Sequence, residues 1–363
     1  MSFDQVKDQK VAIQLLRGIV RRGRVPSGLL FWGPYGVGKR MTAFEFAKAV
    51  NCRESEGDAC DACLSCRKTM HGNHADVTVI RPVSKTRIIT VEQIEAVIET
   101  AMFRPVEGGK RLFLIEDADR MNETAQNHFL KTLEEPPSQT LFVLLSERPR
   151  RLLPTIRSRC QAIRFGALRL ETVAEMIQAE NQFTEEQAYA VAALSRGSVS
   201  RAHDLVKKER RTIVLDIVHR LALGEDPLLV SEEFAAHIQN TEKTIENAVK
   251  SEAKQEAASD PDGDAAVEKE AIEALVAGLV RGELFEYLVL FDAWYRDELV
   301  YGLSRDTQLI YNRDYLNKLK TEIDVEKHAA KIKALADAWK YIERNLKPAR
   351  IFRDLFFTLA LSY

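Results

Sequence analysis

The pattern of apolar and polar residues divides the chain into two unlike parts that meet near Gly166. Before that point, short apolar runs alternate with segments in which apolar residues recur every three or four positions. The runs are typical of buried strands and the periodic segments of amphipathic helices. Strands alternating with helices indicate an α/β domain with a mostly parallel sheet. The expected strands are 27–34, 76–82, 111–121 (ending in acids) and 140–147, with a short helix and a further strand within 152–166. The expected helices are 10–22, 40–52, 91–103 and 122–135.

After Gly166 the periodicity is helical throughout. Three short helices are expected in a small domain at 167–208, followed by an all-α domain at 209–363. Within the all-α domain, the acidic stretch at about 251–271 is poor in large apolar residues and contains Pro and Gly. An exposed loop is expected there.

Composition narrows the class of protein. The chain has 363 residues, enough for two or three domains, and its 45% hydrophobic and 29% charged content is ordinary for a globular protein. The net charge of −2 provides no overall positive field for nucleic acid, so any contact with DNA must be local or come through partners. Neither a secretory signal nor a membrane-spanning run is evident, and the cytoplasm is the expected compartment.

A glycine-rich loop, GPYGVGKR, follows the first predicted strand. Gly33, Gly38 and Lys39 keep the spacing of a phosphate-binding loop, and a strand before it and a helix after it are the required context. Backbone N–H groups of such a loop cradle phosphates, and the lysine reaches the β- and γ-phosphates. The next residue should carry a hydroxyl for magnesium but is Arg40, and Thr42 faces another side of the helix. Weak binding of ATP or ADP is therefore open, whereas magnesium lacks a ligand.

The strand LFLI ends in a pair of acids that belongs beside such a loop. Oligomeric P-loop ATPases place Asp before Glu here, the first to hold magnesium and the second to orient water. In this chain the order is Glu116-Asp117. Each carboxylate is displaced, and a misplacement of about 1 Å can lower a rate about a hundredfold. The loop and the acids together predict a nucleotide-binding fold with weakened or lost catalysis.

Four of the five cysteines are clustered with the spacing C-x7-C-x2-C-x2-C. Clustered cysteines without a secretory signal indicate a metal site, and four thiolates suit a closed, structural zinc site. An iron–sulfur cluster is the rival, but the ferredoxin spacing does not continue after the last of them. His71 and His74 are expected to be ordinary surface histidines, and Cys160 lies in a different motif. The expected ligands are Cys52, Cys60, Cys63 and Cys66.

A basic segment, RPRRLLPTIRSRC, completes a set of motifs that resembles a known family. GPYGVGKR, the cysteine insertion, FLKTLEEPP and LLPTIRSRC occur in this order in the clamp-loader subunits of bacterial DNA polymerase III. The resemblance is strongest over about residues 3–166 and thins beyond that. Within the family, the chain resembles the delta-prime type.

The resemblance implies an AAA+ P-loop domain at 1–166 with a zinc module at 52–66, a helical lid at 167–208 and a helical collar at 209–363. It implies a hetero-pentameric ring with motor (gamma/tau) and clamp-opening (delta) subunits, which places a sliding clamp on primer-template DNA as part of the DNA-directed DNA polymerase holoenzyme. Arg159 is the implied arginine finger for ATP on the neighbouring motor subunit, while the chain's own ATPase activity is expected to be weak or absent. The nucleotide-contact positions implied for this chain are Gly33, Gly36, Gly38, Lys39, Arg40, Glu116, Asp117, Ser146 and Arg201, the last displaced by one residue from its place in motor subunits.

Three alternatives stay open on the sequence. A gamma/tau-type motor subunit would carry Ser or Thr at position 40 and an intact Asp-Glu pair, and this chain has neither. A zinc-containing DNA-binding protein with a vestigial P-loop would have a basic surface, against which the net charge of −2 argues. A small-molecule P-loop kinase would need a hydroxyl beside Lys39.

Overall fold

The protein is described here by a computed structural model, which defines residues 2–82, 88–107, 109–257 and 265–360. They form two compact units. One comprises Met1–Val173 together with Arg196–Arg201, and the other comprises Ala174–Ser195 together with Ala202–Tyr363. Among these described ranges, no helix combines the length and the apolar character needed to cross a membrane.

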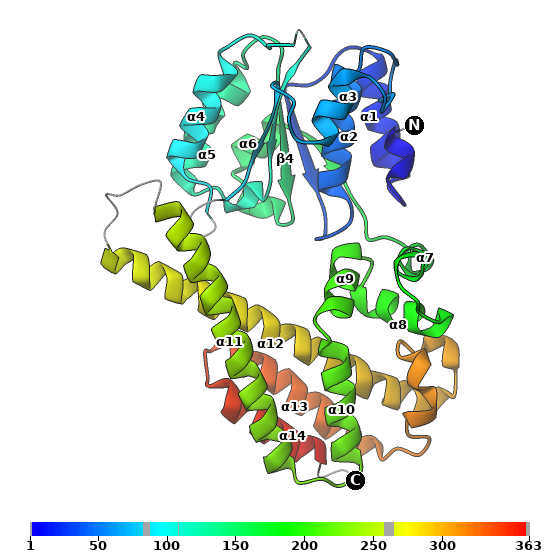
Figure 1. The fold of residues 1–363 in the computed structure, drawn as a ribbon. Helices are drawn as coiled ribbons and strands as arrows, with labels where there is room; N and C mark the ends of the chain where they lie inside the picture. Colours follow the sequence, from blue (N-terminus) through cyan, green and yellow to red (C-terminus); the bar gives the residue numbers. More distant parts are fainter. Residues whose placement is uncertain (1, 83–87, 108, 258–264, 361–363) are drawn as a thin grey trace. The chain divides into compact units, whose positions relative to one another are not determined.

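A five-stranded parallel sheet forms the centre of the first unit (Figure 1). Its order is β2-β3-β4-β1-β5, so the three central strands are buried on both faces, which explains their continuous apolar runs. Since parallel strands end at one edge, the segments after β1, β3 and β4 emerge side by side there. The strands are β1 (Gly28–Trp32), β2 (Val77–Ile80), β3 (Arg111–Ile115), β4 (Thr140–Ser146) and β5 (Gln161–Arg164).

Two layers of helices cover the sheet (Figure 1). On one face lie α1 (Lys10–Arg21), α2 (Lys39–Asn51) and α3 (Leu64–Met70), and on the other lie α4 (Val91–Ala101), α5 (Glu123–Glu134) and α6 (Pro154–Arg159). Side chains alternate between the two faces along each strand. Phe142 of β4 points toward α5, where its ring centroid lies 5.0 Å from that of Phe129, and Phe31 of β1 points toward α2, 6.4 Å from Phe46. The connecting 3-10 helices of this unit are η1 (Ser2–Gln5), η2 (Ala118–Arg120) and η3 (Pro149–Arg151).

Local signals in the sequence explain where these helices begin. Thr90 and Gln93 form a reciprocal capping box at the start of α4, and the Asn122 side chain accepts from the N–H of Ala125 at the start of α5. α5 ends directly before Glu135 and a Pro-Pro pair, which cannot continue a helix. α6 begins with Pro154, whose fixed φ suits the first helical position.

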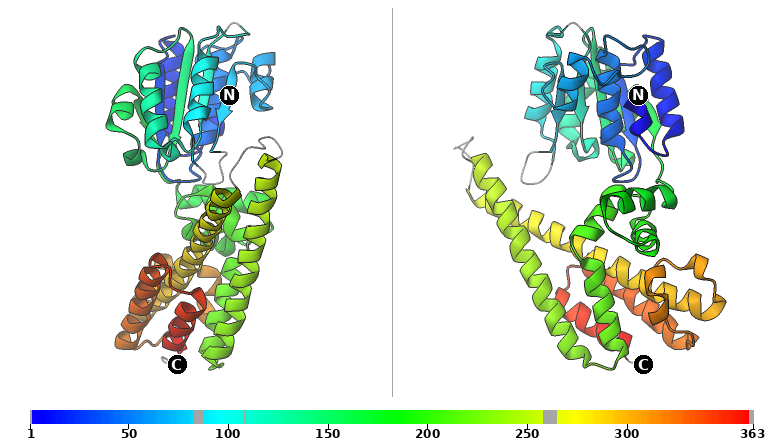
Figure 2. Two further views of the ribbon diagram at one scale, coloured as in Figure 1. Left: turned by 90° about the vertical axis from the view of Figure 1, so that its left-hand side faces the viewer. Right: turned by 45° about the vertical axis from the view of Figure 1, so that its right-hand side comes forward.

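The second unit is helical (Figure 2). α11 packs against α14 and α12, and α13 packs against α12 and α14. An aromatic cluster forms the core: the ring centroid of Phe234 lies 4.7 Å from that of Phe352 and 5.1 Å from that of Tyr287. The helices after the sheet are α7 (Leu170–Glu180), α8 (Glu185–Ser195), α9 (Val199–Lys207), α10 (Arg210–Ala222), α11 (Pro227–Ala257), α12 (Ala265–Ser304), α13 (Val325–Glu343) and α14 (Pro348–Ala360), with the 3-10 helices η4 (Thr307–Leu309) and η5 (Arg313–Lys318).

The fold class expected from the sequence is confirmed: a parallel α/β domain precedes helices, and the strand β5 within 152–166 is present. The predicted three-part division stays a prediction, since the chain has two compact units, with α7 and α9 each divided between them and α8 entirely in the second. The exposed loop predicted at about 251–271 is wrong at its two ends. α11 continues to Ala257 and α12 begins at Ala265, because Ala, Glu, Lys and Gln there favour helix. Residues 258–264, the remainder of that loop, lie outside the described residues.

Candidate functional site

The phosphate-binding loop joins β1 to α2 and has the backbone that such a loop requires. Gly38, the N-cap of α2, has φ +92°, and its Cβ position is open, so an anion can approach the start of the helix. Gly36 has φ +68°, and a Cβ there would lie 2.3 Å from the Ser198 Oγ. The close neighbour is the segment 196–201, whose Val199 N–H donates to the Gly36 carbonyl over 3.0 Å. The loop is therefore packed against the first turn of α9.

Lys39 is directed into its own loop. Its Nζ donates to the carbonyls of Gly33 at 2.7 Å and Pro34 at 2.5 Å, and the residue is only 9% exposed. Burial lowers the pKa of Lys39, an effect opposed by the negative charges of Glu147, Asp117 and Asp119. A phosphate on this loop would have to compete with the two carbonyls for the ammonium group.

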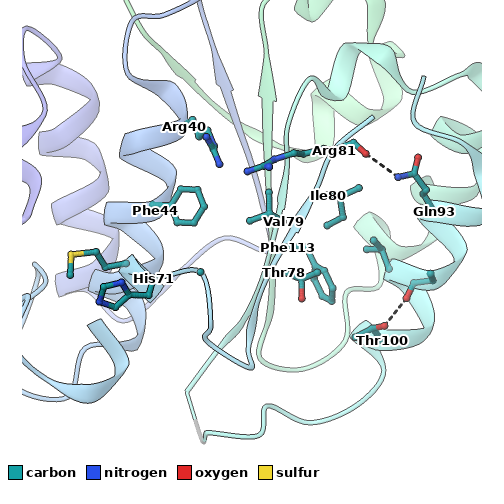
Figure 3. A pocket seen from close by; sticks show the side chains of 14 residues that line it. Arg40, Phe44, His71, Thr78, Val79, Ile80, Arg81, Gln93, Thr100 and Phe113 are labelled. Atoms are coloured by element: carbon teal, nitrogen blue, oxygen red, sulfur yellow. Dashed lines mark hydrogen bonds between the residues drawn. The ribbon is translucent and has the colours of Figure 1, made fainter. Parts of the chain in front are cut away.

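The acid at the end of β3 is held by two arginines. Arg40 Nε lies 2.6 Å from one oxygen of Glu116, and Arg81 Nε, from the segment after β2, lies 3.1 Å from the other. Figure 3 shows the guanidinium groups of Arg40 and Arg81 directed toward each other, with Phe44 below Arg40. Both carboxylate oxygens of Glu116 are thus engaged by positive charges.

These contacts do not fit a magnesium ion at this position. The hydroxyl ligand is replaced by a guanidinium, which has no acceptor, and Glu116 has no oxygen free of a cation. Thr42, the nearest hydroxyl, is buried and donates to the Gly38 carbonyl at 2.8 Å. Asp117 lies in the left-handed region at φ +49°, and its Oδ2 lies 3.6 Å from Arg120 Nε.

A nucleotide phosphate fits the site better than a metal does. Ser146, the last residue of β4, is buried, and its Oγ has no hydrogen-bond partner among the described residues. Its carbonyl accepts from Gly33 N–H at 3.2 Å, so the orphaned hydroxyl lies beside the start of the loop. A buried hydroxyl without a partner is unusual and indicates a polar group that completes it. Arg201 lies on α9, two residues after the Val199 contact with Gly36.

The predicted ligands of the metal centre come together. The sulfur atoms of the four cysteines all lie within 4.8 Å of one another, and Cys60 Sγ is 4.0 Å from Cys66 Sγ. Four sulfurs around a metal at bond lengths of about 2.3 Å would lie about 3.8 Å apart, so the residues present fit a tetrahedral ion after a small contraction. Such an ion would cross-link the loop. The ligands would be Cys52, Cys60, Cys63 and Cys66.

Backbone N–H groups point at the sulfurs. The N–H of Cys63 donates to Cys60 Sγ at 3.2 Å, and the N–H of Cys66 donates to Cys63 Sγ at 3.5 Å. Burial alone would raise the pKa of Cys63, but the N–H groups of Cys66 and Arg53 outweigh it and lower that pKa to about 7. Burial raises the pKa of Cys66. A thiolate at Cys63 is therefore accessible near neutral pH, as metal binding requires.

Two buried contacts attach the cysteine loop to the rest of the unit. Lys48 of α2, 4% exposed at its side chain, lies 2.7 Å from Asp61 and 2.8 Å from Glu45. Asp58 accepts from Arg17 at 2.8 Å and from the N–H of Phe3 at 3.2 Å. α2 thus begins at the phosphate-binding loop and holds the metal loop at its other end.

The two histidines near the cluster differ. His71 is exposed, as predicted, but the expectation of a surface histidine is wrong for His74, which is buried. Its Nε2 lies 3.0 Å from Ser65 Oγ, and its Nδ1 accepts from the Asp76 N–H at 3.1 Å. Both nitrogens are occupied by the surrounding structure, so His74 has a packing role. Cys160 is buried elsewhere, and burial raises its pKa to about 12.

Arg159, the predicted finger, is the last residue of α6. Its side chain is 34% exposed, its NH1 donates to the Thr155 carbonyl at 3.1 Å, and its NH2 pairs with Glu134 at the end of α5. Arg157 on the same helix is exposed and has no side-chain partner among the described residues. Contacts within the chain therefore orient Arg159, the arginine of the SRC motif, whereas none orients the side chain of Arg157 among the described residues.

Sequence reasoning missed Arg81, Glu134, Lys48 and Asp61. The signal for Arg81 was a basic residue directly after a strand that ends at the same sheet edge as the loop. Glu134 stands in the FLKTLEEPP motif, but its pairing with Arg159 joins separate segments, which no local pattern predicts.

The chain is similar to known subunits of DNA polymerase III. Residues 8–169 match the family model described as DNA polymerase III, delta subunit. The chain is 31% identical over 218 residues to the DNA polymerase III subunit delta' of Bacillus subtilis, covering 58% of this chain and 65% of that protein. It is 34% identical over 197 residues to the subunit delta' of Pseudomonas aeruginosa, covering 53% and 60%.

A relative named as another subunit of the same polymerase is less similar in sequence. The DNA polymerase III subunit tau of Bacillus subtilis is 28% identical over 240 residues, covering 61% of this chain and 42% of that protein. The chain spans less than two thirds of the length of each of these relatives. The family model covers residues 8–169, less than half of the chain, and together with the two delta' relatives it shows that this part of the chain is similar to delta-type subunits of DNA polymerase III.

Proposed function

We propose that this chain is the delta-prime-type subunit of a bacterial DNA polymerase III clamp loader. In this role it braces a ring of motor and clamp-opening subunits in the cytoplasm, and the ring opens a sliding clamp and places it on primer-template DNA. Arg159 acts in trans on ATP bound by the neighbouring motor subunit. The family match and the two delta' relatives support the assignment.

The observation that carries the non-motor role is the pairing of Glu116 with Arg40 and Arg81. A motor subunit needs a free carboxylate and a hydroxyl to hold magnesium between them and the nucleotide. Here guanidinium groups occupy both carboxylate oxygens, so the chain lacks the means to hydrolyse ATP itself. The gamma/tau-type alternative is therefore disfavoured, although such proteins are related in sequence.

Two bound groups belong to this proposal. The four cysteines hold one zinc ion. Its role is structural, because a four-thiolate site leaves no open position for water. ATP or ADP binds weakly through the loop amides and Lys39, with Ser146 beside the phosphates. The loop residues then bind and orient a phosphate without chemistry.

Reconstitution tests the proposed function. The chain is expected to co-purify as a defined ring with a motor subunit and a clamp-opening subunit, and to release negligible phosphate from ATP when alone. A complex that forms equally well without this chain would refute the assignment. So would robust ATP hydrolysis by the isolated chain, which would favour the motor type. Zinc-dependent binding of duplex DNA by the isolated chain would instead support the DNA-binding alternative.

A further inference from the structure

A cavity lies at the carboxyl edge of the sheet, on the side where β1, β4 and β5 end. Its volume is about 650 Å³, and it borders the phosphate-binding loop at Gly33 and Pro34. Its walls come from the ends of those strands and from η3. The residues that line it are Trp32, Gly33, Pro34, Glu147, Arg148, Pro149, Arg150, Arg164, Phe165, Gly166 and Ala167.

Three arginines that line this cavity have no carboxylate partner within the described ranges. In the part of the chain that the structure describes, the side chains of Arg148, Arg150 and Arg164 form no ion pair and no hydrogen bond, and all three residues are exposed. By contrast, Arg40 and Arg81 at the same edge are both paired with the carboxylate of Glu116. The lining carries three positive charges and the single negative charge of Glu147, a formal balance of +2. Unpaired guanidinium groups around one cavity suit an anion from outside the chain.

The rest of the lining suits a flat apolar group. Trp32 is half-buried, and the guanidinium of Arg164 lies 5.4 Å from its ring centroid. Pro34 and Pro149 provide further apolar surface. A guanidinium stacked on an indole keeps its in-plane N–H donors free for an oxyanion at the rim. The volume is in the range of about 300–1,000 Å³ that ligand sites of nucleotide size occupy.

We propose that this cavity binds the phosphate of a nucleotide, either free or within single-stranded DNA, on the side of the phosphate-binding loop that faces β4 and β5 and without using Lys39. Arg148, Arg150 and Arg164 hold the phosphate oxygens, and Trp32 with the two prolines contacts the base or sugar. A phosphate is favoured over an acidic peptide because arginine forks match phosphate oxygens in pairs and a base presents a flat face to the indole.

The test uses the full chain with Lys39→Ala, which removes the ammonium group that the phosphate-binding loop would offer to a phosphate. Two probes are titrated at low salt: a fluorescent ADP derivative and a fluorescein-labelled oligothymidylate, with tryptophan fluorescence as a second readout. Binding is expected to persist in Lys39→Ala and to weaken about tenfold when Arg150→Ala or Arg164→Ala is added, as for loss of one charged hydrogen bond. Trp32→Phe should abolish the change in tryptophan fluorescence.

Arg104→Ala is the matched control, since Arg104 is exposed and lies in the segment before β3, at the opposite edge of the sheet. Tighter binding of the ADP derivative would identify a free nucleotide as the source of the phosphate, and tighter, strongly salt-dependent binding of the oligothymidylate would identify a DNA strand. The proposal is overturned if Lys39→Ala alone removes all binding, if Arg104→Ala weakens it equally, or if oligoglutamate binds as tightly as both phosphate probes.

Discussion

Single side chains decide what the phosphate-binding loop can do. Arg40 is the visible departure from a motor subunit, but Glu116 is also paired with Arg81, 3.1 Å away. Replacing Arg40 with threonine supplies the hydroxyl and leaves that second pair in place. We therefore expect Arg40→Thr to release no more phosphate from ATP than the parent chain, as measured by a continuous phosphate assay.

The double variant Arg40→Thr/Arg81→Ala is the informative comparison, because it frees both oxygens of Glu116. It should gain magnesium-dependent nucleotide affinity even if turnover stays low, since the Glu116-Asp117 order is unchanged. Robust hydrolysis by Arg40→Thr alone would contradict the role assigned to Arg81.

Another single residue links stability to pH. Burial would raise the pKa of Glu283 on α12, but hydrogen bonds from Arg210 and Lys208 outweigh it and hold that pKa below its ordinary value of 4.5. A carboxyl whose pKa is lower in the folded state stabilises the fold above pH 4.5 and loses this contribution as pH falls through the folded-state value. Glu283→Gln should lower the free energy of unfolding by about 3 kcal/mol at pH 7, because it leaves the buried Arg210 unpaired.

Denaturant titrations between neutral and acidic pH check this expectation. The difference between Glu283→Gln and the parent chain should shrink below pH 4.5, where the carboxyl becomes protonated first in the unfolded chain, and disappear as pH falls through the lower pKa of the folded protein. Glu246→Gln is the control, since its partner Lys250 is on the same helix and both side chains are at least 41% exposed. That pair should contribute less than about 1 kcal/mol at any pH. If Glu283→Gln and Glu246→Gln lowered the free energy of unfolding equally, the stability would not depend on the charge of Glu283.

At the scale of elements, periodicity predicted most of what the structure contains. The central strands were evident because burial on both faces demands continuous apolar runs, and α7, α8 and α9 because Asn181–Thr184 and SRGS separate them. The loop predicted at about 251–271 was wrong at its ends, since charge and small size do not exclude helix. The pairing of Glu116 with Arg81 could not be predicted, because it depends on which strands end side by side.

The metal loop offers a prediction at this scale. Asp61 lies between two cysteines and is tied to Lys48 of α2 over 2.7 Å. Asp61→Asn removes the charge while tolerating the left-handed φ of +58° at this position. Because contacts beyond the ligands orient them, the variant should lose zinc to a chelator about tenfold faster. Hydrogen exchange should rise within 52–75 and stay unchanged in β1, β3 and β4.

Elemental analysis of the freshly prepared parent chain comes first, since iron in place of zinc would overturn the metal assignment. Glu56→Ala is the matched control, because Glu56 is exposed in the same loop and has no side-chain partner among the described residues. If Glu56→Ala releases zinc as fast as Asp61→Asn, the Lys48 contact does not hold the loop.

At the scale of the whole molecule, the function proposed here is carried by a surface rather than by a complete active site. The chain keeps the fold of a nucleotide enzyme, while the acid that would serve its own nucleotide is neutralised by Arg40 and Arg81. The arginine of the SRC motif, at the end of α6, is held within its own chain by Glu134 and Thr155. Such an arginine is pre-oriented, and a neighbouring γ-phosphate has to compete with one carboxylate for it.

Arg159→Ala should therefore act on the assembly and not on the fold. Its side chain is 34% exposed, so its loss leaves no cavity, and ring formation should persist. ATP hydrolysis by the motor subunits and clamp loading should fall by an order of magnitude or more, since arginine fingers contribute about a thousandfold or more in other phosphoryl-transfer systems. Arg157→Ala, on the same helix, is the control and should have little effect.

Glu134→Gln frees the finger from its carboxylate and should leave the rate equal or higher, because Arg159 then meets the γ-phosphate without a competing anion. A complex with Arg159→Ala that loads clamps as fast as the parent complex would show that the arginine is only part of a basic turn.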